Sequence, residues 1–144
     1  MMIYLIGSLR NDRIIHIGNA IREIGIDVHD DWHSAGPEAD DYWLTDQKLK
    51  GLTYKEALAG PAAQFVFNFD KEFLDRAQAG VLVLPAGKSA HLEAGYLIGW
   101  RKPVWILFDK EPDRWDVMYN FAKDVFFNVD DLVAELKRRY ENVR

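Results

Sequence analysis

The sequence predicts a three-layer α/β sandwich, in which helices cover both faces of a mostly parallel sheet of about five strands. Segments with strand-like and helix-like patterns alternate along the chain, which is typical of parallel α/β folds. Two short runs, Val81–Leu84 and Val104–Phe108, are apolar throughout, as expected for central strands buried on both faces. With 144 residues, 49% hydrophobic and 28% charged, the chain is predicted to form a single domain over residues 1–144.

The first part of the chain predicts a strand, a helix and a second strand. Met2–Ile6 is a short apolar run that ends at a Gly-Ser pair, as a first strand would. Asp12–Ile24 is predicted to be a helix closed by Gly25, because isoleucines recur at helical spacing at positions 14, 17, 21 and 24. Ile26–His29 is the second strand. The polar, aromatic segment Asp30–Trp43 is expected to be an irregular loop, and loops of this length are usually functional.

The rest of the chain continues the alternation of helices and strands. Thr53–Phe67 and Asp70–Ala79 are predicted to be two helices, both preceding the first of the apolar strands. The pattern then predicts a helix over Ala90–Trp100, a short edge strand over Val125–Asn128 and an amphipathic helix over Asp130–Tyr140.

Composition excludes several classes of function. The formal net charge of −5 argues against non-specific binding of nucleic acid, which depends on neutralising phosphates with Lys and Arg. The absence of cysteine excludes disulfides, thiolate catalysis and Cys-based zinc sites. The apolar run at the N-terminus is too short for a signal peptide or a membrane span, so a soluble cytoplasmic protein is expected, with no membrane partner.

The turn Gly87-Lys88-Ser89 follows the first apolar strand and resembles the end of a Walker A loop. That motif requires a glycine where Leu82 stands, so binding of a triphosphate in this way is excluded. What remains is a strand-to-helix turn whose backbone N–H groups suit an anion. Ser89 is interpreted either as a helix N-cap or as a ligand contact.

Two carboxylates lie where a ligand would be expected. Glu93 falls in the first turns of the predicted helix, and its structural interpretation is a capping box, although Leu92 occupies the position that Ser89 would require. Asp70 is interpreted either as the N-cap of its helix or as a second functional carboxylate. A pair of carboxylates in different environments is what cleavage of a glycosidic bond needs.

Other polar and aromatic residues have both structural and functional interpretations. Arg10, in the turn after the first strand, suits bidentate contact with a phosphate, or is a surface arginine. His29 and His33 lie in a strand and a loop rather than on one helix face, so no metal is expected. Trp32 and Trp43 either stack on a flat base or pack the loop down.

Three pieces of the sequence together resemble the nucleoside 2-deoxyribosyltransferase superfamily. They are Ile3–Arg10 (IYLIGSLR), Asp70 ahead of the central strand, and Gly87–Tyr96 (GKSAHLEAGY), in which Glu-x-Gly-Tyr is the most specific pattern. The resemblance covers most of the chain and implies a flavodoxin-like fold and chemistry without a metal or other cofactor. It makes Glu93 the nucleophile that attacks C1′ of a 2-deoxyribose, Asp70 the acid and base, and Tyr4 the residue that orients Glu93.

Two branches of the superfamily are compatible with these residues. The turn Gly7-Ser8-Leu9-Arg10 resembles the nucleoside 5′-monophosphate N-hydrolases, in which a serine and an arginine hold the phosphate, and this favours hydrolysis. Lys88 and Ser89 would add contacts. Gly87 departs from both branches, because hydrolases have a serine there and transferases an aspartate. Base exchange on free deoxynucleosides stays open, with Trp32 and Trp43 as a water-excluding lid.

The resemblance also implies a small-molecule deoxynucleoside or deoxynucleotide as the ligand, and a homodimer or higher homo-oligomer. In the superfamily a neighbouring subunit often completes the site, which here would involve Asp116–Asn120. Two alternatives are a nucleotide sensor that binds without turnover and an α/β domain whose acids only cap helices. The last of these does not explain why Tyr4, Asp70 and Glu93 all fall at strand ends on one side of the predicted sheet.

Overall fold

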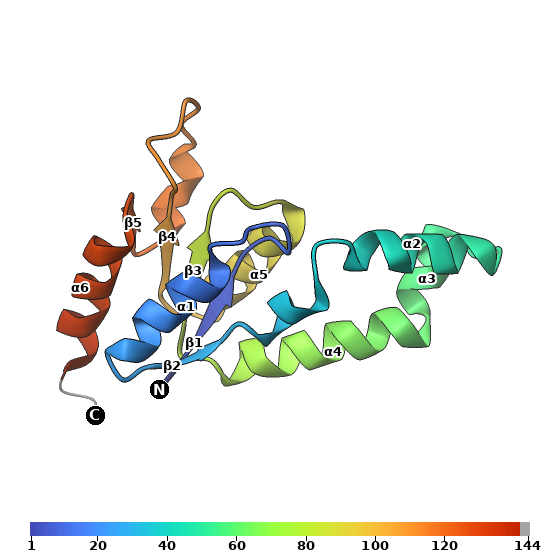
Figure 1. Cartoon of the computed structure of the whole chain (residues 1–144), viewed down its shortest axis with the longest axis horizontal. Helices are drawn as coiled ribbons and strands as arrows, with labels where there is room; N and C mark the ends of the chain where they lie inside the picture. Colours follow the sequence, from blue (N-terminus) through green and yellow to red (C-terminus); the bar gives the residue numbers. More distant parts are fainter. Residues whose placement is uncertain (142–144) are drawn as a thin grey trace.

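The computed structural model describes residues 1–141 and contains a five-stranded, all-parallel sheet in the order β2-β1-β3-β4-β5 (Figure 1). The strands are β1 (Met2–Ile6), β2 (Asp27–His29), β3 (Ala79–Val83), β4 (Val104–Leu107) and β5 (Asp124–Phe126). The helices are α1 (Ile14–Glu23), α2 (Ala39–Leu49), α3 (Tyr54–Ala59), α4 (Pro61–Arg76), α5 (Lys88–Gly99) and α6 (Val129–Tyr140), with short 3-10 turns η1 (Asp31–Ala35) and η2 (Val117–Phe121).

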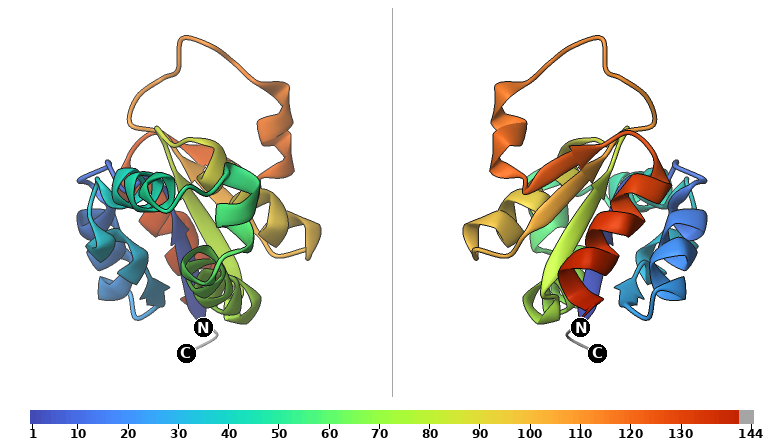
Figure 2. Two further views of the ribbon diagram at one scale, coloured as in Figure 1. Left: turned by 90° about the vertical axis from the view of Figure 1, so that its right-hand side faces the viewer. Right: turned by 90° about the vertical axis from the view of Figure 1, so that its left-hand side faces the viewer.

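Each face of the sheet is covered by helices, which confirms the predicted three-layer sandwich of the flavodoxin-like kind. Successive side chains of a strand point to opposite faces, so Ile3 and Leu5 meet α1 and α6 while Tyr4 and Ile6 meet α5 and the end of α4. Figure 2 shows α1 and α6 on one side of the sheet and α5 on the other. The two faces bury separate apolar clusters, and the sheet is the common wall between them.

The strand order places a topological switch point between β1 and β3. From β1 the chain runs to β2, which is its neighbour toward one edge of the sheet. It then crosses to β3, which is the neighbour of β1 in the opposite direction. In open α/β sheets, ligands bind outside the carboxyl ends of the strands at such a point. The turns that follow Ile6 and Val83 therefore define the edge of the sheet where a functional site is expected.

The loop predicted over Asp30–Trp43 is wrong, because most of this segment is ordered into η1 and the first turn of α2. Asp40 and Asp41 lie in that first turn, where carboxylates stabilise the helix dipole. The polar composition from which a loop was predicted therefore also suits a helix N-terminus.

The two helices predicted over Thr53–Phe67 and Asp70–Ala79 are also divided differently. Thr53 and Glu56 form a capping box that begins the short helix α3. Gly60 and Pro61 then end α3 and begin α4, with proline at the first helical position. From Pro61 to Arg76 the helix is continuous, so it passes through Asp70 without a break. The edge strand also lies slightly earlier than predicted, at Asp124–Phe126.

Helices α2 and α3 and the first half of α4 extend away from the α/β body as an arm, defined here as residues 39–69 (Figure 1). Figure 2 shows a second excursion, the segment between β4 and β5 that includes η2. No helix within residues 1–141 is long and apolar enough to cross a membrane.

The core on the α1 side provides a direct test of this packing. Ile17 is fully buried in α1, whereas Ile15 on the same helix is 48% exposed. We expect Ile17→Ala to lower the free energy of unfolding by about 2–4 kcal/mol, because it removes buried methyl groups and leaves a cavity. Ile15→Ala should change it by less than about 0.5 kcal/mol. Urea unfolding of both variants checks this, and equal effects would contradict the orientation of α1.

Candidate functional site

An open depression of about 450 Å³ lies at the switch point. Its walls come from the turns after β1, β3 and β4, and it is lined by Ser8, Arg10, Asn11, Asp12, Arg13, Pro85, Ala86, Gly87 and Asp109. The predicted contacts Ser8, Arg10 and Gly87 are therefore gathered at one place. Lys88 and Ser89 are exposed in the first turn of α5, outside this lining.

The turn after β1 is held in a compact shape by its own polar groups. Ser8 Oγ accepts a hydrogen bond from the backbone N–H of Arg10 at 3.1 Å, and Asn11 Oδ1 accepts one from the N–H of Arg13 at 3.0 Å. Gly7 is required for close packing, since a Cβ there would lie 2.7 Å from Cδ1 of Ile14. The turn therefore brings α1 close to the strand and leaves the side chains of residues 8–13 around the depression.

Several hydrogen-bond donors in this turn suit an anion. The side-chain N–H groups of Asn11 (Nδ2) and Arg13 (Nη1) are buried and have no partner among residues 1–141. Arg10 pairs with Asp41 of α2 at 3.2 Å, with both side chains largely exposed. An exposed ion pair of this kind contributes little, so Arg10 is free to exchange Asp41 for another anion.

The structure also brings Tyr4, Asp70 and Glu93 together from β1, α4 and α5, outside the lining of the depression. The pKa of Glu93 is raised to about 8, first by burial and then by the charge of Asp70, while a hydrogen bond from Tyr4 acts in the opposite direction. Burial also raises the pKa of Asp70. Tyr4 is 1% exposed, and burial together with both carboxylates raises its pKa. At neutral pH the pair of carboxyl groups therefore retains a proton.

The capping interpretations of these acids are wrong. The N-cap of α5 is Gly87, so Ser89 lies inside the helix and Glu93 lies beyond its first turn. Asp70 lies in the second half of α4, far from its N-terminus. Neither carboxylate completes a helix end, and both are partly buried beside a tyrosine. A capping role therefore does not explain why Asp70 and Glu93 lie together.

His29, which the sequence analysis considered only as a metal ligand, forms part of the same region. It ends β2 with 3% exposure, stacks on Phe73 of α4 at a centroid distance of 3.9 Å, and lies 5.0 Å from the Tyr4 ring. Burial lowers its pKa, so the neutral imidazole is favoured. Its position at the end of a strand next to β1 is the sequence signal that could have found it.

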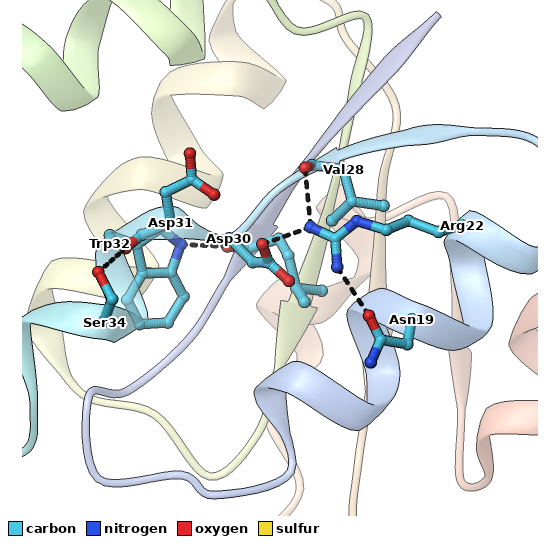
Figure 3. Close-up of polar contacts among 8 residues, drawn as sticks. Asn19, Arg22, Val28, Asp30, Asp31, Trp32 and Ser34 are labelled. Carbon is cyan, nitrogen blue, oxygen red and sulfur yellow. Dashed lines mark hydrogen bonds and ion pairs between the residues drawn. The ribbon is translucent and has the colours of Figure 1, made fainter.

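The end of β2 is anchored to α1 by a partly buried ion pair between Arg22 and Asp30. Arg22 donates hydrogen bonds to the backbone carbonyl of Val28 and to Asp30, which is 4% exposed, and also contacts Asn19 (Figure 3). A Cβ at Gly18 would collide with the Asp30 carboxylate, so glycine there permits the close approach. This anchor fixes the strand end that carries His29.

The two tryptophans lie in different places, Trp32 in η1 and Trp43 in α2. Trp32 donates a hydrogen bond from Nε1 to the Leu5 carbonyl at 2.8 Å and packs against the core, so it fastens η1 to β1. Trp43 belongs to α2 in the arm, where it meets Tyr54 edge to face. For Trp32, the alternative in which the ring packs the segment down is the one that the contacts support.

The segment after β4 is tied to the start of α5 through His91. Its Nδ1 donates to the Gly87 carbonyl at 2.8 Å, and its Nε2 accepts a hydrogen bond from the Tyr119 hydroxyl at 2.9 Å. His33 instead donates from Nε2 to the Asn11 carbonyl at 2.8 Å. Among residues 1–141, no group of three or more His, Cys, Asp or Glu side chains is placed to hold a metal ion.

Comparison of the chain with protein-family models finds no match, and a search of curated proteins also finds none. The function therefore has to be inferred from the chemistry of the site itself.

The carboxyl pair makes the stability of the fold depend on pH. Because the pKa of Glu93 is about 8 in the folded protein and 4.5 is the ordinary value, the folded state holds a proton that the unfolded state has released between these limits. Stability should therefore fall as the pH rises through that window. We expect Glu93→Gln to be more stable than the wild type by about 1 kcal/mol or more near pH 9, and to lose this advantage near pH 5.

Urea unfolding at several pH values measures this difference directly. Glu72→Gln, which changes an exposed carboxylate on α4, is the matched control and should follow the wild type. A stability difference between Glu93→Gln and the wild type that is independent of pH would contradict the buried, protonated state of Glu93.

Proposed function

We propose that the protein cleaves the N-glycosidic bond of 2′-deoxynucleoside 5′-monophosphates and releases the free base. The observation that carries the proposal is the convergence of Glu93, Asp70 and Tyr4. A separate anion-suited depression at the switch point supports it. Two carboxyl groups with raised pKa values and different surroundings are suited to the chemistry of glycoside cleavage.

In the first step the Glu93 carboxylate attacks C1′ of the deoxyribose while the bond from C1′ to the base nitrogen breaks. Asp70 gives its proton to the departing base, and a deoxyribosyl ester of Glu93 remains. In the second step Asp70 takes a proton from water, the resulting hydroxide attacks C1′, and the ester bond to Glu93 breaks. The deoxyribose 5-phosphate leaves, and both carboxyl groups return to their starting states.

The proton that this reaction needs is already present in the resting site. Burial and mutual repulsion keep one proton on the carboxyl pair at neutral pH, with Glu93 the group whose pKa is near 8. In the reactive form this proton is on Asp70 instead of Glu93. The carboxyl pair therefore holds one proton in both the resting and the reactive form. Tyr4 supports the shift, because its hydrogen bond favours the ionised form of Glu93.

The preference for a monophosphate comes from the turn after β1. Ser8, Arg10, Asn11 and Arg13 line the depression, and two of these have buried N–H groups without a partner among the described residues. A 5′-phosphate would satisfy such donors, and its charge suits the nearby N-terminus of α1. A free nucleoside would leave them unpaired, so exchange of bases between nucleosides is the less supported alternative.

Turnover assays with Glu93→Ala test the proposed nucleophile. Each common deoxynucleoside and deoxynucleoside monophosphate is incubated with the protein, with and without a second free base, and the products are separated by liquid chromatography. We expect base release from monophosphates, and a loss of about 10³-fold or more in Glu93→Ala but not in the exposed control Glu72→Gln.

The other outcomes identify the alternatives. A new nucleoside that forms only with added base would indicate base exchange instead of hydrolysis. Binding of monophosphates without any product, with affinity unchanged in Glu93→Gln, would indicate a nucleotide sensor and would sink the enzymatic proposal.

The phosphate contact is tested by Arg10→Ala. We expect the KM for a deoxynucleoside monophosphate to rise at least about tenfold, with little change for the corresponding deoxynucleoside, because the lost interaction is specific to the phosphate. Asp41→Asn releases Arg10 from its ion pair and should leave this KM unchanged or lower it. If Arg10→Ala affects nucleosides and nucleotides equally, the arginine does not hold the phosphate.

A further inference from the structure

The two carboxyl groups of the candidate site stand on different helices. Glu93 belongs to α5 and Asp70 to α4, so their separation depends on how these two helices pack. Leu74 of α4 is buried in the same apolar cluster as Ala94 and Leu97 of α5. Apolar burial is not directional, and a small side chain such as alanine does little to fix the register of one helix on another. The separation of the carboxyl groups therefore also depends on polar contacts between the helices.

A cluster of three polar side chains joins α5 to the end of α4. The Tyr96 hydroxyl of α5 donates a hydrogen bond to the Asp75 carboxylate of α4. Lys71, one turn before Asp75, donates to the same carboxylate at 2.9 Å, and its ammonium group lies 5.7 Å from the centre of the Tyr96 ring. The hydrogen bonds from Tyr96 and Lys71 lower the pKa of Asp75, which keeps it ionised. An exposed contact of this kind adds little stability, but it fixes a direction.

A second polar contact holds the end of α4 from the turn that follows α5. Lys102 Nζ donates hydrogen bonds to the backbone carbonyls of Leu74 at 3.0 Å and Asp75 at 2.8 Å, which are among the carbonyls that the end of a helix leaves without a partner. The preceding residue, Arg101, has a left-handed backbone with φ of 61°, a conformation that glycine usually adopts at this place. The turn that presents Lys102 to α4 therefore has an uncommon geometry, and the end of α4 is held by both contacts.

These contacts lie within two helical turns of the carboxyl groups of the site. Tyr96 follows Glu93 by three residues, so the two side chains are neighbours on the surface of α5. Asp75 follows Asp70 by five residues in the continuous helix Pro61–Arg76, which is about 7.5 Å along the helix axis. Because an unbroken helix moves as one piece, a shift or rotation of α4 at Asp75 also moves Asp70 relative to Glu93.

We propose that Tyr96 is a positioning residue, whose hydrogen bond to Asp75 holds α4 at the distance from α5 that the two carboxyl groups of the site require. The Glu-x-Gly-Tyr segment then carries both the proposed nucleophile and the group that positions the acid on the neighbouring helix. The part of Tyr96 in catalysis rests on the proposed function. Its effect on geometry does not, because the proximity of Asp70 governs the protonation of Glu93 with or without turnover.

Urea unfolding as a function of pH tests this positioning without any substrate. The titratable groups that act on Glu93 are Asp70 from α4 and Tyr4 from β1, and burial followed by the charge of Asp70 raises the pKa of Glu93. If Tyr96→Phe lets α4 shift, both effects weaken and this pKa falls toward its ordinary value. The stability gained by Glu93→Gln at pH 9 relative to pH 5 should then shrink to about half or less in the Tyr96→Phe background.

Tyr42→Phe is the matched control, because the Tyr42 hydroxyl donates a similar exposed hydrogen bond to Glu38 at the start of the arm, at 2.9 Å. This variant should leave the gain from Glu93→Gln unchanged. A purely structural role of Tyr96 would lower stability equally at every pH. If the gain from Glu93→Gln is the same with and without Tyr96→Phe, the proposal is overturned, whatever the activity of the protein.

Variants of Asp75 test the same contact from the other helix. The amide oxygen of asparagine can accept the hydrogen bond from Tyr96, so Asp75→Asn should keep most of the pH-dependent gain from Glu93→Gln. Asp75→Ala removes the acceptor and should shrink the gain as Tyr96→Phe does. Combining Tyr96→Phe with Asp75→Ala should add little, because both changes remove one contact. Fully additive effects would show that Tyr96 does not act through Asp75.

Kinetics give a separate measurement where the proposed reaction is observed. Tyr96→Phe should lower kcat about tenfold with little change in KM, because it displaces the acid of the site and lies outside the lining of the depression. A rise in KM with kcat unchanged would contradict a positioning role. A wild type without turnover would contradict the proposed function instead, and the pH dependence of stability would still decide the role of Tyr96.

Discussion

The arrangement of the site depends on how closely α5 approaches the sheet at Gly80. Gly80 lies beside Tyr4 in the register between β1 and β3, and a Cβ there would come within 2.6 Å of Cδ1 of Leu97 and 3.2 Å of Cδ1 of Ile6. The missing side chain lets Leu97 pack directly on the strand. Since Glu93 precedes Leu97 by one helical turn, the same contact sets its carboxylate beside the Tyr4 hydroxyl. A glycine in the core thus determines the position of a functional acid.

The two carboxyl groups of the site lower the free energy of unfolding of the protein. Removing Glu93 and Asp70 from water costs free energy, and their mutual repulsion adds to this cost, as the raised pKa of each group indicates. The Tyr4 hydrogen bond offsets only part of it. A fold optimised for stability alone would place apolar residues at these positions, which is why two partly buried acids without a capping role favour a functional interpretation.

Sequence patterns predicted the sheet well because buried parallel strands have an unmistakable apolar run, as in Val81–Leu84 and Val104–Phe108. They also selected Tyr4, Asp70 and Glu93, which the structure brings together, although the proximity of Asp70 depends on tertiary packing of α4. The arm was missed because α2 has few apolar residues at core spacing and buries only Gln47. His29 was considered only as a metal ligand because its stacking on Phe73 is a long-range contact, and its place at the end of a predicted strand was the one sequence signal of its burial.

Helix α4 joins the arm to the α/β body, although the sequence predicted two separate helices along its length. Its last turns, with Leu74, are buried against the body, and its first turns extend into the arm. Asp70 lies at the transition between them, next to Phe69 and Phe73. Phe73 stacks on His29, and Phe69 packs against Phe73, so the contacts of α4 with the body fix the position of this carboxyl group relative to Glu93. The acid of the site and the exposed Phe65 and Val66 are therefore carried by one continuous helix, whose buried end sets the place of the acid.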